Sequence, residues 1–231
     1  MLIIRNDAGY LRLSELLTAA YVGKDRNVHH AELNPEWLEN GDNSGLICLS
    51  GAHYGEVGVN LLNGNEDAAR AAALKYAAWF PDAFYLELQR LPERPEWEAC
   101  VSGSVKLAEE LGLPVVATHP TQFMSRDDFN AHEARVCIAG GWVLTDKKRP
   151  RDFTPSQFFI PPETMLERFA DLPEALENTV EIAKRCNIHI TLGKNFLPLF
   201  PTPDGLSLDD YLVKLSNEGL QERMVQLYPD E

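Results

Sequence analysis

Four short apolar runs, widely spaced along the chain, are the feature that most limits how it can fold. They predict strands at residues 2–5, 45–50, 84–88 and 114–118, because aliphatic and aromatic runs of this length are typical of buried strands. His53, Glu87 and His119 lie at or just beyond the ends of the last three runs. In barrel-like α/β folds, active sites collect where strands end. Four strands are too few to close a barrel, so the chain is predicted to be part of a larger domain.

Helical periodicity fills the intervals between and after these runs. Apolar spacing, Asn and Asp caps and Pro stops predict helices at residues 8–20, 35–39, 66–80, 95–111, 126–139, 163–169, 173–185 and 207–227. Alternation of strands and helices predicts parallel pairing, with helices covering the sheet. In the 173–185 helix, Leu176, Val180 and Ala183 are predicted to face inward. Later in the chain the alternation stops, which predicts a domain edge near residue 155 and only a short strand at 188–192.

The composition is that of a soluble globular protein with an acidic surface. Apolar residues make up 45% of the chain, charged residues 24%, and the net charge is −14. Binding to a phosphate backbone rests on Lys and Arg, so this segment is not expected to hold nucleic acid by itself. The one basic run, residues 147–151, is predicted to be a solvated loop. No GxxxxGK[ST], GxGxxG or GxSxG motif supports a nucleotide-fold or serine-hydrolase interpretation.

Cysteine usage and hydropathy favour a cytoplasmic location. The four cysteines are widely separated and form no CxxC pair, which is typical of a reducing compartment. The N-terminal residues carry no signal peptide, and no apolar stretch approaches the ~18–20 residues of a membrane span. No membrane partner is therefore expected.

Several longer strings go beyond these general patterns. They include FYLELQ at 84–89, GLPVVAT at 112–118, DFNAHEAR at 128–135, KRPR at 148–151, LPEA at 172–175, NTVEIAKRC at 178–186 and FLP at 196–198. Together, in order and over essentially the whole chain, they resemble the bacterial DNA polymerase III alpha-subunit family. The resemblance implies an internal fragment: an α/β fold, a partial, open, PHP-type distorted β/α barrel with a mostly helical C-terminal extension.

The resemblance also implies two regions and a division of labour. Residues 1–155 would be the later part of the PHP (polymerase and histidinol phosphatase) domain, and 156–231 a helical connection into the polymerase palm. The family's opening metal motifs would lie upstream of Met1 and its palm aspartates downstream. Mg²⁺ is therefore implied for the full polymerase, and no cofactor is expected in this fragment. No catalytic residue is assigned to this chain, and its binding residues are unknown.

The resemblance further implies partners, while two other functional classes stay open. Partners would be other polymerase III subunits, above all the proofreading exonuclease, with DNA reached only through the polymerase regions. The fragment itself is expected to self-associate, since cutting a barrel exposes sheet edges. The alternative is a metal-dependent phosphoesterase or pyrophosphatase of the PHP superfamily, and a third option is a free-standing interaction module.

The family's metal ligands carry over poorly to this sequence. The cysteine of its Ser-Gly-Cys turn falls at Ala52, and its Asp-X-His pattern falls on residues 120–122, Pro-Thr-Gln. Glu87 matches the strand glutamate, whereas His53 and His119 lie one residue beside the ligand positions. Because metal affinity falls steeply with each lost ligand, no bound metal is expected and these three residues are predicted to be a vestigial site.

Polar side chains near the vestigial site are therefore expected to have structural roles. His119 is predicted to be held by hydrogen bonds, and a buried Glu87 to need a cationic partner. The candidate cations for that pairing are Arg90, Arg135 and Lys106. His132 and Glu133 are predicted to cap or pack the helix that starts near residue 126.

Overall fold

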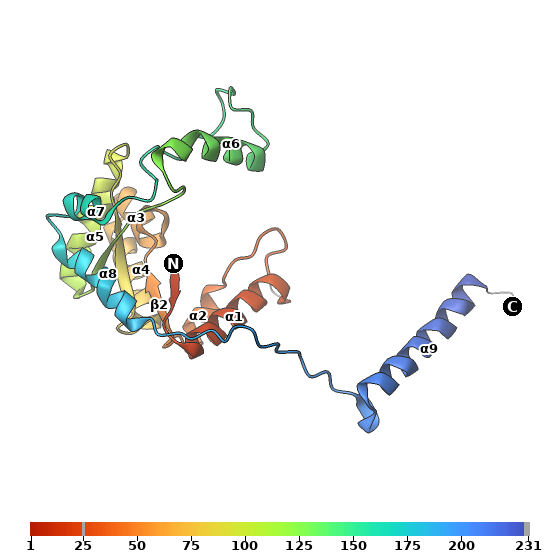
Figure 1. Cartoon of the computed structure of the whole chain (residues 1–231). Helices are drawn as coiled ribbons and strands as arrows, with labels where there is room; N and C mark the ends of the chain where they lie inside the picture. Colours follow the sequence, from red (N-terminus) through yellow and green to blue (C-terminus); the bar gives the residue numbers. More distant parts are fainter. Residues whose placement is uncertain (25, 229–231) are drawn as a thin grey trace. The chain divides into compact units, whose positions relative to one another are not determined.

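The computed structural model describes residues 1–24 and 26–228; residues 25 and 229–231, which fall within the two predicted regions, lie outside it. The chain forms two compact units, Met1–His189 and Ile190–Glu231. The first holds the sheet and the helices that pack on it (Figure 1). The predicted domain edge near residue 155 stays a prediction, whereas the first compact unit continues to His189.

A four-stranded open sheet forms the centre of the first unit, in the order β1-β2-β3-β4. Its strands are β1 (Leu2–Ile4), β2 (Leu46–Leu49), β3 (Phe84–Gln89) and β4 (Val115–Thr118), so all four predicted strands are confirmed. Strands β2, β3 and β4 are parallel, as the alternation predicted, and β1 is antiparallel to β2. The described strands do not close into a barrel.

Two glycines explain how β1 meets β2. Helix α1 (Asp7–Val22) starts directly after β1, with Asn6 accepting a hydrogen bond from the Gly9 amide. A Cβ atom on Gly9 would lie 1.8 Å from the Gly45 carbonyl oxygen, so only glycine allows this approach. The start of β2 therefore lies beside the end of β1, which is antiparallel geometry.

Helices cover the sheet and largely match the predicted ranges. They are α2 (Pro35–Glu39), α3 (Glu56–Leu62), α4 (Glu66–Trp79), α5 (Glu98–Leu111), α6 (Phe129–Gly140), α7 (Pro162–Arg168) and α8 (Pro173–Arg185), with 3-10 turns at Ala52–Tyr54, Pro95–Trp97 and Arg126–Asp128. Helix α3 was not predicted, because it is short and follows directly on the glycine-rich turn after β2. It packs against both α4 and α5.

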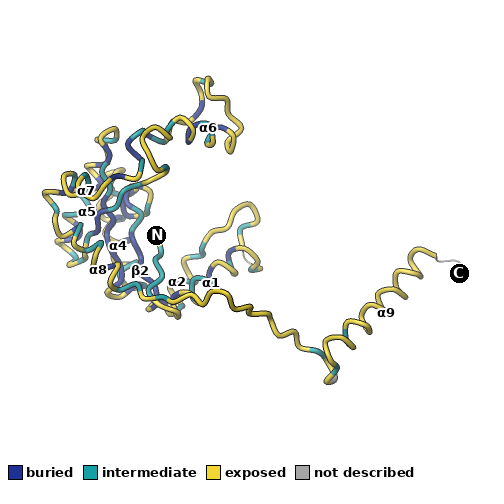
Figure 2. Tube along the Cα trace, viewed as in Figure 1, coloured by how far each residue is buried: buried dark blue, intermediate teal, exposed yellow. Residues whose placement is uncertain are grey.

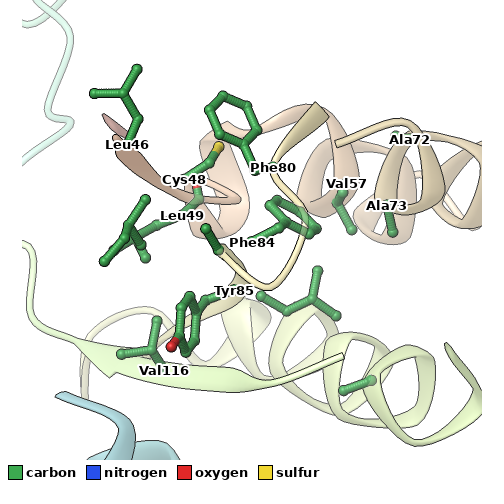
Figure 3. Packing of buried hydrophobic residues seen from close by; sticks show 14 of the residues in the cluster. Leu46, Cys48, Leu49, Val57, Ala72, Ala73, Phe80, Phe84, Tyr85 and Val116 are labelled. Atoms are coloured by element: carbon green, nitrogen blue, oxygen red, sulfur yellow. The ribbon is translucent and has the colours of Figure 1, made fainter. Parts of the chain in front are cut away.

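The main hydrophobic core lies between the sheet and the α3–α5 layer. Cys48 and Phe84 from the strands meet Val57, Ala72 and Phe80 from the helical side (Figure 3). The small side chains of α4 let this helix approach the sheet closely. The buried strands and the exposed outer helix faces are separated clearly in Figure 2.

Helix α8 covers β4 and closes a second, smaller core. Asn178 donates from Nδ2 to the Val115 carbonyl at 2.8 Å. On the same helix, Ala175 is buried in this smaller core and Ile182 in the main core. The predicted inward face of α8 is confirmed for Leu176, which packs against the smaller core, and is wrong for Val180, which is 54% exposed, and for Ala183, which is exposed. The predicted strand at 188–192 is also wrong, since these residues are not paired with the sheet.

The second compact unit contains helix α9 (Leu208–Leu227), preceded by a short 3-10 turn at Pro203–Gly205. Ser207 caps α9 by accepting a hydrogen bond from the Asp210 amide at 3.1 Å. Apolar side chains of α9, among them Leu212, Leu220 and Val225, are exposed in this chain.

Candidate functional site

Glu87 lies in the middle of β3 and is 3% exposed. Its carboxylate accepts hydrogen bonds from three neutral groups: the backbone N–H of Gly51 at 3.1 Å, the Thr118 hydroxyl at 2.6 Å and the side-chain amide of Gln89 at 3.2 Å. The turn after β2, strand β3 and the end of β4 are therefore joined through one side chain. Three donors satisfy both carboxylate oxygens and offset the cost of burying the group.

The prediction that Glu87 pairs with a cationic side chain is wrong. Among residues 1–24 and 26–228, no Lys or Arg forms an ion pair with it. Arg90 instead binds Glu98 and Asp171, and Lys106 binds Glu66 on the surface. Hydrogen-bond donors that belong to the sheet and its turns take the place of a charge, and sequence spacing did not reveal them.

His119 follows β4 and is held at both ring nitrogens, so its predicted hydrogen bonding is confirmed. Nε2 lies 2.9 Å from the Phe158 carbonyl, and Arg168 donates from Nη1 to Nδ1 at 3.3 Å. These contacts fit the neutral ring with its proton on Nε2. Burial, and then the nearby Arg168 cation, lower the pKa of His119. No ring nitrogen of His119 retains a lone pair for a metal ion.

His53 has a different environment from the other two candidates. Gly51, with φ of 84°, and Ala52, with φ of 44°, form the left-handed turn that directs the His53 ring onto Trp97, with ring centroids 3.5 Å apart. Both ring nitrogens are buried and have no hydrogen-bond partner among the described residues. Burial, followed by the Arg94 charge, lowers the pKa of His53 to about 4.

The three candidates do not combine into a metal-binding set. Within the described part of the chain, no group of three or more His, Cys, Asp or Glu side chains is placed to hold a metal ion. The oxygens of Glu87 and the nitrogens of His119 are already engaged, and Ala52 offers no donor atom. The residues present therefore do not fit the metal cluster that the superfamily implies.

His132 and Glu133 belong to the packing of α6, as predicted. The His132 ring is buried between Phe123 and Phe153. Glu133 forms an ion pair with Arg149, whose Nη1 lies 2.5 Å from Glu133 Oε2, and both side chains are at most 7% exposed. The prediction that residues 147–151 form a solvated loop is thus wrong for Arg149. This side chain is buried because it pairs with Glu133, 16 residues earlier in the sequence.

Comparison with known proteins places these observations in a family. Residues 1–91 match the PHP domain family model. Over its full length the chain is 99% identical to part of the DNA polymerase III subunit alpha of Neisseria meningitidis serogroup A (strain Z2491). The chain belongs to the DNA polymerase III alpha-subunit family. The predicted resemblance is confirmed.

The same family match holds at greater evolutionary distance. Identity is 47% over 226 residues with the DNA polymerase III subunit alpha of Escherichia coli K12, and 98% of the chain is covered. The chain spans about a fifth of the length of these relatives, 20% and 19% respectively. The relatives are named as subunits, so they are described as parts of a larger enzyme. No helix in the described part of this chain is long and apolar enough to cross a bilayer.

Sequence reasoning missed a group of arginines beside this region. Arg90, Arg94 and Arg168 line one cavity, although Arg168 is far from the other two in sequence. The only sequence signal was that Arg90 and Arg94 follow the end of β3, and nothing in the sequence placed α7 beside them.

Proposed function

We propose that this chain is a structural part of a replicative DNA-directed DNA polymerase that works in the cytoplasm. The whole polymerase would add deoxynucleotides to a primer with two Mg²⁺ ions, held by residues outside this chain. The PHP module would serve as a scaffold and as the docking site for the proofreading exonuclease subunit. The near-identity to the Neisseria alpha subunit supports the parent assignment.

The hydrogen bonding of Glu87 is the observation that carries the scaffold role. Three of the roughly four acceptor positions of its carboxylate are taken by hydrogen bonds, from the turn after β2, from the end of β4 and from Gln89 in β3 itself. His119 is likewise engaged on both sides. These hydrogen bonds support the proposal that the rim of the sheet holds strand ends together and does not bind a metal ion.

One observation favours a second candidate, a metal-dependent phosphoesterase or pyrophosphatase. The two ring nitrogens of His53 are buried and have no partner among the described residues, and such groups are uncommon without a functional or structural reason. In the scaffold proposal, the stacking of His53 on Trp97 supplies that reason.

Elemental analysis of the full-length subunit separates the two candidates. The scaffold proposal expects no stoichiometric zinc or manganese at the PHP module and no chelator-sensitive hydrolysis of a phosphodiester or of pyrophosphate. A stoichiometric transition metal that is lost together with hydrolysis on chelation would overturn it. His53→Phe, which removes both free ring nitrogens, serves as the matched variant for any activity found.

A competition experiment tests the docking role. The full-length alpha subunit, immobilised, is expected to capture the exonuclease subunit, and an excess of the isolated chain is expected to compete for that capture. An unrelated acidic protein of similar net charge controls for nonspecific binding. Capture that the chain does not reduce at any excess would place the docking site elsewhere in the subunit.

A further inference from the structure

Beside the loop that follows β3, the chain contains a cavity of about 390 Å³. Three arginines line it: Arg90 and Arg94 from the loop and Arg168 from the end of α7. Apolar surface from Pro95 and Trp97 completes the wall. The concentration of cationic groups is unusual for a chain whose net charge is −14.

The charge of Arg90 is fully compensated. Its guanidinium donates to both oxygens of Glu98, at 3.0 and 2.7 Å, and to both oxygens of Asp171, at 2.6 and 2.9 Å. The Arg90 guanidinium is thus engaged from two sides by carboxylates. The same bonds occupy Glu98, the one acidic residue of the cavity lining.

The charges of Arg94 and Arg168 are compensated far less than that of Arg90. Arg94 Nη2 donates to the Arg151 and Asp152 carbonyls at 3.2 and 3.0 Å, and Nε is buried with no partner among the described residues. The one carboxylate paired with Arg94, on the exposed Glu96, lies 3.7 Å from Nη1. Arg168 donates only to the Arg90 carbonyl and to His119 Nδ1, and it forms no ion pair in the described part of the chain. Burial lowers the pKa of Arg168, and the nearby Glu93 carboxylate offsets this effect only in part.

Two half-buried guanidinium groups on one cavity make a site for an anion of matching charge. A guanidinium presents several N–H donors in a fixed plane and binds phosphate or carboxylate through paired hydrogen bonds. Two such groups match the roughly two negative charges of a phosphomonoester at neutral pH better than the single charge of a carboxylate. The volume exceeds that of phosphate alone, which leaves room for an organic group against Pro95 and Trp97.

We propose that Arg94 and Arg168 form a metal-independent binding site for the phosphate group of a small phosphomonoester. The site uses loop and α7 residues, and none of Ala52, His53, Glu87 or His119 lines it. It binds and does not hydrolyse, because no nucleophile or free general base lines the cavity within the described residues. The proposal does not depend on the polymerase or docking roles.

Titration calorimetry on the full-length subunit tests this site, with inorganic phosphate, adenosine monophosphate and adenosine as probes. We expect saturable binding of phosphate, tighter binding of adenosine monophosphate, and none of adenosine. Arg94→Gln and Arg168→Gln are each expected to weaken binding by about tenfold or more, since each removes hydrogen bonds to a charged group. Arg126→Gln removes an equal charge from an exposed 3-10 turn outside the cavity and is expected to leave binding unchanged.

A measurement on the unaltered protein covers the case in which a variant fails to fold. Phenylglyoxal modifies accessible arginines, and peptide mass spectrometry with and without phosphate reports which ones the anion protects. Protection of Arg94 and Arg168, but not of Arg126, supports the site. Equal modification with and without phosphate, equal binding of adenosine and its monophosphate, or variants that bind like the parent would each overturn it.

Discussion

Replacing Glu87 tests whether its carboxylate holds the strand ends together. In the parent chain, one buried side chain accepts from the Gly51 amide, the Thr118 hydroxyl and the Gln89 amide. Glu87→Ala removes all three acceptors at once. Glu87→Gln keeps one oxygen of the same shape but turns an NH₂ group toward a donor.

The local geometry sets the size of the expected effect. Thr118 and Gln89 can still bond to each other, because Gln89 Nε2 already lies 2.9 Å from the Thr118 hydroxyl. The Gly51 amide belongs to a left-handed backbone turn and cannot rotate away. A buried donor left without an acceptor costs ~1–3 kcal/mol, and each lost hydrogen bond about 1 kcal/mol more. We therefore expect Glu87→Ala to lower the free energy of unfolding by ~2–4 kcal/mol and Glu87→Gln by ~1–2 kcal/mol.

Urea unfolding followed by circular dichroism measures these differences at constant pH. The slope of the unfolding free energy against urea should stay the same, which marks a change in stability alone. Glu109→Gln, on the exposed face of α5, removes the same charge and is expected to change stability by less than ~0.5 kcal/mol. If both Glu87 variants unfold at the same urea concentration as the unsubstituted chain but lose a bound metal, Glu87 is a metal ligand and the structural interpretation is wrong.

Three further predictions follow from other parts of the first unit. Glu133→Gln leaves Arg149 charged and buried without its partner, so unfolding free energy should fall by about 3–5 kcal/mol in urea titrations, whereas Glu181→Gln in the exposed Glu181–Lys184 pair should change little. The pKa of His53 is lowered from 6.5 to about 4, so on acidification the unfolded chain takes up the proton before the folded chain does. Stability is therefore lost as pH falls from about 6.5 toward 4. Thermal unfolding across this range should show a smaller loss of stability in His53→Phe than in the unsubstituted chain. The isolated chain should self-associate through the edge strand β1. The Ile4 N–H points away from β2, because Met1 and Arg5 make the hydrogen bonds to that strand. Sedimentation should show dimers or larger species that Ile4→Pro reduces, and a monodisperse, cooperatively unfolding monomer of the unsubstituted chain would contradict this.

The sequence alone was sufficient for most elements of the fold. Apolar runs bounded by turns located all four strands, and caps such as Asn6 and Asn65 located helix starts, because these signals depend on residues close together in the chain. The long shared strings identified the family for the same reason, since they are read directly from the residue order. The vestigial site residues His53, Glu87 and His119 were named from strand ends alone, and the bonding of His119 was predicted correctly.

Tertiary structure decided which groups these residues meet. Antiparallel β1 depends on the contact between Gly9 and Gly45, and the buried face of α8 depends on where β4 lies, so Ala175 and Ile182 are buried in place of Val180. Glu87 is held by neutral donors from the turn after β2 and from the end of β4, and Arg149 is buried because it pairs with Glu133. Each of these outcomes rests on contacts between residues far apart in sequence, whose energies arise only once the chain has packed.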